Sequence, residues 1–343
     1  MKSTFDLVCL FGYSPFFVEL SRFCAEGNVR CALVFGSRQQ DSIETLCVPD
    51  GTLKIKTDSL ACQKYQQLEI SNKNCLGISF GAPFIFTQSE IDEFKGNLIN
   101  SHGAPLPDFK GGGGFSWRIL QRDKRGASLM HFVSPQIDEG DCVFRHDFQF
   151  SESERLPIDY ESRQAQEDKN NLMPWLQAVI KKELILKSMG ESRHAIDAGT
   201  YFPRLYTDIH GFMDWSMPIH ELESFMLAFS RPYSGASTFF KGERLRLFDC
   251  RIHDLCDMHQ FTWGLIIAFN HGQMLVAVNG GVIKIGIEDV CFDREVKRIA
   301  QGDRLITPAN YIRRAISSRA YFKPDGVLIK DFDIRDPSFE PKQ

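Results

Sequence analysis

The sequence predicts a two-domain α/β protein, in which a Rossmann-like domain with a mostly parallel sheet is followed by a small β-barrel domain. Three observations support this prediction. The chain has 343 residues, which is more than one typical domain needs. Apolar strand-like runs and a helical stretch alternate near the start, which is typical of parallel βαβ units. Several short strand-like runs with Gly and Asn turns crowd the last third, and these suit a small barrel.

The first elements form a strand, helix and strand in succession. Residues 5–11 are almost continuously apolar and predict a buried strand, residues 16–25 a helix, and residues 29–35 a second strand. The Gly-x-Gly-x-x-Gly nucleotide fingerprint is missing from the intervening turn, which excludes NAD binding. Residues 74–80 read as the next buried strand, and Thr87 or Ser89 caps a short helix at residues 90–94.

The later elements are separated by a polar stretch. Residues 96–100 predict a short buried strand, and residues 172–188 predict an amphipathic helix. A helix is expected at 219–229, and short strands at 245–248, 261–268, 274–278 and 282–287. We therefore expect a catalytic domain at 1–190, a linker at 191–215, a C-terminal domain at 216–330 and a polar tail at 331–343.

Three side chains suited to acyl transfer lie at the end of the strand at 96–100 or beyond it. Side chains alternate faces along a strand, so Asn100 and His102 project the same way at its carboxyl end, where chemistry is usual in open α/β sheets. Asp138 comes later, in an Asp-Glu-Gly turn. Taken singly, each residue has an ordinary structural explanation, because Asn and Asp form turns and most histidines are structural. Together they supply an amide, an imidazole and a carboxylate.

A longer pattern surrounds these residues. Asn100-x-His102 is followed by Leu106-Pro107, a glycine run at 111–114, Trp117 and the turn at 138–140. This order resembles the N10-formyltetrahydrofolate-dependent formyltransferases. Residues 199–204, 213–216 and 231–239 also follow the order of the two-domain members, whose catalytic domain precedes a small OB-like barrel. The resemblance implies that Asn100, His102 and Asp138 are catalytic and that N10-formyltetrahydrofolate is the formyl donor.

The glycine run departs from one branch of the family. The tRNA-directed members usually read Arg-Gly-Ala-Ala-Pro where this chain reads Lys110-Gly-Gly-Gly-Gly-Phe115. That loop borders the acceptor site, so the resemblance is greatest to enzymes that formylate a nucleotide-linked amino sugar for surface polysaccharide synthesis. Two alternatives stay open: a methionyl-tRNA formyltransferase and a non-catalytic folate-binding protein.

The chemistry of formyl transfer assigns a role to each of the three side chains. An imidazole has an unperturbed pKa of about 6.5, so His102 is suited to take the proton of the attacking amine. Asp138 would orient His102 and favour its charged form by Coulomb attraction. Asn100 can donate an N–H to the formyl oxygen as negative charge grows there, and loss of one such donor commonly costs roughly 10²–10³ in rate.

The resemblance also places the two substrates. It puts the folate beside Phe84, Ile85 and Phe86 and beside the turn from Ile137 to Gly140, with core packing as the alternative for the two phenylalanines. The glycine run lacks the Lys-Ser/Thr ending of a P-loop, which argues against NTP hydrolysis. We interpret it as an acceptor-side loop, with a plain flexible turn as the alternative. The expected acceptor contacts are Gly111, Gly112, Gly113, Arg204 and Trp215, with Arg231 and Tyr233 as further candidates and packing as the alternative for Trp215.

Composition and cysteine spacing restrict the binding partners and the cellular compartment that we expect for this protein. A net charge of −4 disfavours a large nucleic-acid footprint, and no run of apolar residues is long enough to span a membrane. The ten cysteines are scattered without a Cys-x-x-Cys pair, which indicates reduced thiols in the cytoplasm. Cys250, His253, Cys256 and His259 recur at steps of three, a spacing that fits no common zinc pattern, so no metal is expected. A homodimer is expected from the family's habit.

Overall fold

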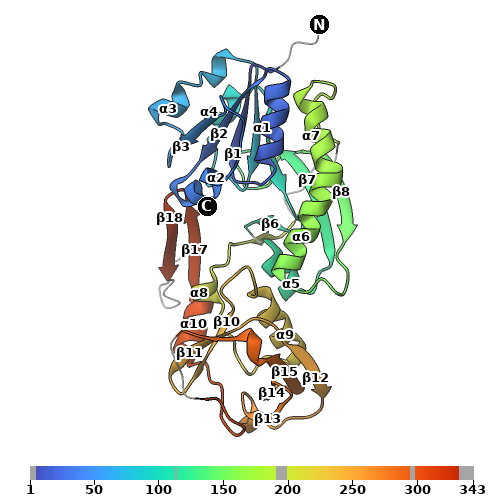
Figure 1. The fold of residues 1–343 in the computed structure, drawn as a ribbon, viewed down its shortest axis with the longest axis vertical. Helices are drawn as coiled ribbons and strands as arrows, with labels where there is room; N and C mark the ends of the chain where they lie inside the picture. The colour runs from blue at the N-terminus through green and yellow to red at the C-terminus, as the bar shows by residue number, and fades with distance from the viewer. Residues whose placement is uncertain (1–4, 113, 191–198, 294–297, 332–343) are drawn as a thin grey trace.

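The N-terminal unit is built on one seven-stranded sheet (Figure 1). The computed structural model describes residues 5–112, 114–190, 199–293 and 298–331. The strand order is β3-β2-β1-β4-β5-β7-β8. Strands β1 to β5 pair in parallel, whereas β7 is antiparallel to both β5 and β8. The strands are β1 (Leu7–Gly12), β2 (Arg30–Phe35), β3 (Leu53–Lys56), β4 (Cys75–Phe80), β5 (Leu98–His102), β7 (Arg125–Phe132) and β8 (Cys142–Gln149).

Helices cover both faces of this sheet, as the alternation of side chains along β1 requires. Val8 and Leu10 pack into the cluster with α1 (Phe17–Glu26) and α7 (Met173–Ile180), whereas Leu7 and Phe11 pack into the opposite cluster. All four side chains are fully buried. The remaining helical segments of this unit are η1 (Ser37–Gln39), α2 (Gln40–Glu44), α3 (Gln63–Gln66), η2 (Ile70–Asn72), α4 (Gln88–Glu93), α5 (Gly114–Leu120), α6 (Pro157–Glu167) and η3 (Asp168–Leu172).

The strands expected at 5–11, 29–35, 74–80 and 96–100 are confirmed with small shifts of their ends. Thr87 caps α4 as expected, because its side chain accepts from the Glu90 N–H and the Glu90 carboxylate accepts from the Thr87 N–H. The helix predicted at 172–188 is wrong in both limits. The helical run starts at Pro157, passes through the π-helical η3 and ends at Ile180. The run ends there because Lys182 has a positive φ, which a helix does not allow. The earlier start was not predicted because α6 is mostly charged and polar, and its buried residues are only Pro157, Tyr160 and Gln164.

The C-terminal unit consists of two sheets packed with one helix. One sheet has the order β10-β11-β16 and the other β12-β15-β14-β13. The helix expected at 219–229 is α9 (Ile219–Ala228), and its buried side chains join the core of this unit. The structure shows sheets here, and a closed barrel stays a prediction. The strands are β10 (Ala236–Phe240), β11 (Glu243–Leu247), β12 (Arg251–Leu255), β13 (Ile266–Asn270), β14 (Gln273–Val278), β15 (Gly281–Gly286) and β16 (Val290–Phe292), with short helices η4 (Gln260–Thr262) and η5 (Ile287–Asp289).

Two segments connect the units in ways that the sequence did not predict. Part of the expected linker forms β9 (Tyr201–Phe202), which pairs in parallel with β6 (Lys110–Gly111), and α8 (Thr207–His210). After α10 (Ala309–Ser317), the hairpin of β17 (Ser318–Lys323) and β18 (Gly326–Asp331) returns to the N-terminal unit near α2 (Figure 1). There the Arg38 N–H donates to the Pro324 carbonyl at 2.9 Å. Residues 191–198 of the linker and 332–343 of the tail lie outside the described residues.

In the described part of the chain, no helix is both long enough and apolar enough to cross a membrane.

Candidate active site

Asn100, His102 and Asp138 come together at the carboxyl edge of β5. Asn100 and His102 are two residues apart on β5, and Asp138 lies in the turn between β7 and β8 with a φ of 54°. His102 Nδ1 is 3.5 Å from Asp138 Oδ2, and both side chains are largely buried. The fold therefore brings an imidazole and a carboxylate from distant segments into direct contact, with the amide of Asn100 on the same strand as His102.

A fourth residue, His131 on β7, joins this group and was not singled out from the sequence. It pairs directly with Asn100 across the antiparallel β5–β7 ladder. Its Nε2 lies 3.2 Å from Asn100 Nδ2 and 3.4 Å from Asp138 Oδ1. His131 is 3% exposed, so its contacts are to protein groups. No local pattern marks it, because the strand register that sets it opposite Asn100 depends on how two separate strands align.

The hydrogen bonds of Asn100 orient its amide. Ser79 Oγ donates to Asn100 Oδ1 at 2.7 Å. The His131 Nδ1 is 2.7 Å from the carbonyl of Phe132, which can only accept, so Nδ1 carries a proton and Nε2 of the neutral ring accepts from Asn100 Nδ2. One N–H of the Asn100 amide is thereby used. The second N–H has no partner among the described residues and is available to a bound carbonyl oxygen.

The environment of His102 favours its neutral form. Its Nε2 is 2.7 Å from the carbonyl of Phe109, so this nitrogen carries the proton, and in the neutral ring Nδ1 faces Asp138 with a free lone pair. Burial lowers the pKa of His102 below its ordinary value, and the attraction of Asp138 opposes this only in part. The expectation that Asp138 favours the charged ring is therefore right in sign, but burial has the larger effect.

Asp138 stays ionised in the same site. Burial opposes its charge, yet the attraction of the His131 and His102 rings in their charged forms and a 2.7 Å hydrogen bond from the Gly111 N–H outweigh burial and lower the pKa of Asp138 to about 2. Both of its distances to imidazole nitrogens exceed a normal N–H···O bond, so the carboxylate acts on the rings mainly through its charge. A proton arriving at His102 would create an ion pair with a carboxylate that is already in place.

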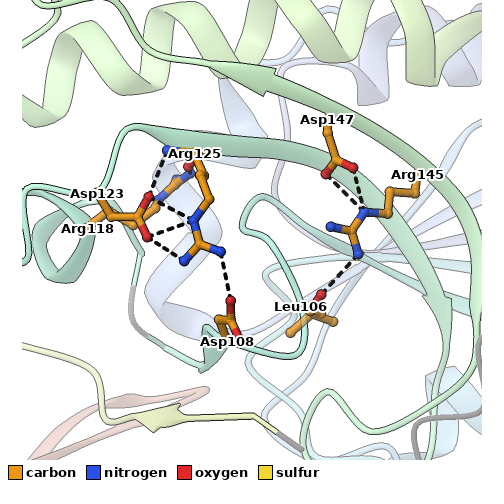
Figure 2. Close-up of polar contacts among 7 residues, drawn as sticks. All are labelled: Leu106, Asp108, Arg118, Asp123, Arg125, Arg145 and Asp147. Carbon is orange, nitrogen blue, oxygen red and sulfur yellow. Dashed lines mark hydrogen bonds and ion pairs between the residues drawn. The ribbon is translucent and has the colours of Figure 1, made fainter.

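Three arginines hold the loop that follows His102. Arg118 donates to the carbonyl of Gly103 at 2.9 Å. Arg145 donates to the carbonyl of Leu106 at 3.0 Å (Figure 2). Arg125 donates to the Asp108 carboxylate at 2.8 Å. Because this loop supplies the Phe109 carbonyl to His102 and the Gly111 amide to Asp138, the arginines position acceptor and donor atoms of the site.

Arg118 differs from the other two because it is fully buried. Its guanidinium lies against the rings of Phe115, Phe150 and Tyr160, with its carbon 5.1, 5.1 and 5.8 Å from their centroids. Burial lowers its pKa to about 10, so it keeps its charge at neutral pH. A second bond, at 3.1 Å to the Arg125 carbonyl, ties it to the start of β7.

A cavity of about 470 Å³ lies beside the Asp138 turn. Gly140 lines it, and a Cβ there would lie 1.7 Å from the Phe132 carbonyl oxygen, so only glycine fits. Of the other expected folate contacts, Ile137 and Ile85 are exposed, Phe84 is half-buried, and Phe86 packs edge-on against Phe11 in the core. The placement of Phe86 agrees with the packing alternative. The cavity is lined by Phe132, Val133, Ser134, Gln136, Glu139, Gly140 and Asp141.

The glycine loop is tightly packed against residues 201–204. A Cβ at Gly111, which has a φ of 88°, would lie 2.6 Å from the Phe202 carbonyl oxygen, and a Cβ at Gly112 would lie 1.7 Å from Arg204 Cγ. This packing disagrees with the alternative of a plain flexible turn. Gly113 lies outside the described residues. Trp215 is buried in the C-terminal core and donates to Thr238 Oγ1 at 2.9 Å, which agrees with the packing alternative and not with an acceptor contact.

The described residues contain no group of three or more His, Cys, Asp or Glu side chains placed to hold a metal ion. The segment with His253 forms strand β12, and Cys250 just before it is buried.

Comparison with known proteins gives this site a context. Residues 207–291 match the sequence model of the formyl transferase C-terminal domain. The methionyl-tRNA formyltransferase of Acetivibrio thermocellus is 22% identical over 213 residues, and that of Alkaliphilus oremlandii is 24% identical over 217 residues. These alignments cover 61% and 62% of this chain, and 64% of each relative. The chain thus spans just under two thirds of the length of these relatives.

Solved structures share the fold. WlaRD, a sugar 3N-formyl transferase crystallised in the presence of dTDP and 5-N-formyl-THF, has a TM-score of 0.57 at 14% identity, over 86% of this chain and 100% of that one. The N-formyltransferase from Helicobacter canadensis, in complex with folinic acid and dTDP-3-aminofucose, has a TM-score of 0.56 at 13% identity, over 82% and 99%.

The fold and the site define an α/β protein with an Asn-His-Asp group at the carboxyl edge of its sheet, joined to a C-terminal sheet domain. Residues 207–291 match the formyl transferase C-terminal domain, and the chain as a whole is similar to formyltransferases in sequence and in fold.

Proposed function

We propose that this protein transfers the formyl group of N10-formyltetrahydrofolate to the amine of a nucleotide-activated amino sugar, in surface polysaccharide synthesis. One observation carries the reaction type: a free N–H of Asn100 and the lone pair of His102 Nδ1 lie in one buried site beside an ionised Asp138. These are the groups that acyl transfer to an amine requires, and no side chain in this proposal needs to become covalently attached.

Each residue has a stated part in this reaction. Asn100 donates its remaining N–H to the formyl oxygen as negative charge grows there. His102 takes the proton of the attacking amine on Nδ1, and the resulting imidazolium donates to Asp138 and to the Phe109 carbonyl. The bond between the formyl carbon and the donor nitrogen then breaks, and the departing nitrogen recovers a proton from His102. The low pKa of Asp138 keeps its charge ready for this step.

The residues around the 470 Å³ cavity suit a folate as the formyl donor. Gly140 and the backbone of residues 133–141 offer carbonyl and amide groups beside Asp138, and amide-like edges of a pterin can pair with such groups. The bound folate would supply the activated formyl group. Within this proposal, the half-buried Phe84 and the exposed Ile137 are apolar members of the two expected folate segments.

The choice of acceptor is supported by the loop between His102 and α5. Its glycines are packed against Arg204 and Phe202, where the tRNA-directed relatives usually have a different loop sequence. A net charge of −4 also gives little support to a broad tRNA surface. The proposal includes a cytoplasmic enzyme, a homodimer and closure of the two C-terminal sheets into a small OB-like barrel, all of which stay predictions.

Methionyl-tRNA formylation is the second candidate, because the curated relatives carry that name. The test is to incubate the protein with formyl donor and, separately, a panel of nucleotide-linked amino sugars and charged initiator tRNA. Mass spectrometry should show the gain of one CO unit on an amino sugar. The gain must vanish in the His102→Ala and Asn100→Ala variants. A gain on the tRNA alone would overturn the acceptor assignment, and folate binding without any transfer would favour a non-catalytic protein.

A further inference from the structure

Two arginines that have no anionic partner among the described residues share one aromatic ring beside the candidate active site. Arg38 follows β2, and Arg204 lies between β9 and α8. Their guanidinium carbons are 5.1 Å and 5.2 Å from the ring centroid of Phe322 on β17. Among the residues that the structure describes, neither guanidinium has an ion pair or a hydrogen bond, and the Nε of Arg38 is buried without a partner.

The other half-buried and buried arginines differ in this respect. Arg155 donates to Asp249 and Glu223, and Arg118 donates to two carbonyls. Taking a guanidinium out of water without an anion costs free energy, so buried charges are normally paired. Burial lowers the pKa of Arg204, and burial together with the nearby charge of Arg204 lowers that of Arg38. Within the part of the chain that the structure describes, the pair is therefore a local excess of positive charge that no carboxylate neutralises by direct contact.

The pair lies next to the reacting groups. The stem of Arg204 occupies the space where a Gly112 side chain would be, since a Cβ there would lie 1.7 Å from Arg204 Cγ. The neighbouring Gly111 N–H donates to Asp138, and the charge of Asp138 is close enough to Arg204 to raise its pKa against the effect of burial. The carboxylate itself is engaged by Gly111 and by two histidines, so it does not serve as the partner of either arginine.

The contact of Arg38 and Arg204 with Phe322 depends on how the β17–β18 hairpin docks on residues 36–38. The hairpin that carries Phe322 docks where the Arg38 N–H donates to the Pro324 carbonyl. A Cβ at Gly36 would lie 2.7 Å from that carbonyl oxygen, so the glycine permits the close approach. The Arg319 guanidinium on β17 also contacts the Tyr201 hydroxyl at 3.3 Å. The hairpin thus fixes the aromatic ring against which both cationic side chains lie.

We propose that Arg38 and Arg204, held against Phe322, bind the diphosphate group of the acceptor. This inference rests on the proposed function, whose acceptor carries such a group. A guanidinium matches phosphoryl oxygens with paired N–H donors, and two adjacent guanidiniums match the two or more charges of a diphosphate. A diphosphate at this position lies beside Gly112 and Asp138, and it would hold the sugar amine toward His102.

The test measures binding of inorganic pyrophosphate and of uridine diphosphate to the full chain by calorimetry. Arg38→Met keeps an apolar stem against Phe322 and removes the charge. The substitution should lower the affinity for both ligands by about tenfold or more. Arg38→Lys should retain more affinity than Arg38→Met. Arg22→Met on α1, exposed and remote from the site, is the matched control and should bind like the wild type. Equal binding by wild type and Arg38→Met, or no binding by the wild type, overturns the proposal.

The outcomes separate this site from the proposed reaction. Pyrophosphate binding that needs Arg38, without formylation of any amino sugar, supports the site and refutes the proposed function. Formylation in which Arg38→Met raises the KM of a polyglutamylated formyl donor, but not that of the acceptor, overturns the site, because the arginines then hold folate carboxylates. If Arg38→Met does not fold, as judged by circular dichroism, the wild type decides: pyrophosphate affinity must fall as salt rises, and a salt-independent affinity overturns the proposal.

Discussion

Asn100 and His131 face each other across the β5–β7 ladder, with the amide nitrogen of Asn100 3.2 Å from His131 Nε2. This contact sets which end of the amide points into the site. Ser79 occupies the oxygen end at 2.7 Å, so the amide is oriented by one donor and one acceptor. The candidate catalytic group is therefore a set of four side chains, in which His131 positions Asn100 and neighbours Asp138.

Replacing His131 should lower the rate more than it affects binding. His131→Phe keeps a buried ring but removes the acceptor that orients Asn100, so we expect kcat to fall by roughly tenfold to 10²-fold, less than the roughly 10²–10³ expected for Asn100→Ala. Steady-state kinetics with both substrates would show this as a change in kcat with KM nearly constant. The exposed His253→Ala on β12 is the control. An unchanged kcat in His131→Phe would show that the amide needs no such partner.

On the acid side of the pH profile, which we call the acid limb, kcat/KM should fall at a pH below the ordinary pKa of histidine. His102 acts as a base only when neutral, and burial lowers its pKa below 6.5, so the free enzyme should keep its activity as pH falls through 6.5 and lose it further down. In Asp138→Asn the attraction that opposes burial is gone, so the limb should move to still lower pH while the maximal rate drops. The profile of kcat/KM against pH measures both. A wild-type limb above pH 6.5 would contradict the assignment of His102.

Loss of Arg118 should destabilise the protein. Arg118→Met leaves the partly buried carbonyls of Gly103 and Arg125 without this donor, which should cost about 2–4 kcal/mol of unfolding free energy in urea titrations. Arg122, two residues beyond the end of α5, is more than half exposed and lies 3.3 Å from Glu221. Arg122→Met should therefore change stability by less than about 1 kcal/mol. Similar losses for the two variants would refute the role given to the buried guanidinium.

A methyl group at Gly112 should impair acceptor use selectively. The new Cβ would occupy the position of Arg204 Cγ, so Arg204 must move away from Phe322 and the glycine loop. In Gly112→Ala we expect the acceptor KM to rise several-fold while the KM of the formyl donor changes little. Gly326→Ala is a fair comparison, because nothing lies within 4 Å of a Cβ there and its φ is not positive. Equal effects on both KM values would mean that the loop does not border the acceptor.

The candidate site shows which of its parts a sequence can predict. Asn100 and His102 share a face because strand side chains alternate, and this follows from two positions on one strand. The motif order identified Asp138, but not that Gly111 and two histidines would contact its carboxylate. The extended helix at 172–188 was misplaced because apolar spacing continues past Ile180, whereas the backbone turns at Lys182.

By itself, the sequence determined the order of most buried strands and helices, the shared face of Asn100 and His102, and the position of the glycine run at 111–114. These are local properties, since periodicity and residue size act within a few positions. Only the tertiary structure decided that His131 faces Asn100 and that Arg38, Arg204 and Phe322 meet beside the glycine loop. These contacts depend on strand register and on the docking of the β17–β18 hairpin against the segment that follows β2, and both involve residues far apart in the sequence.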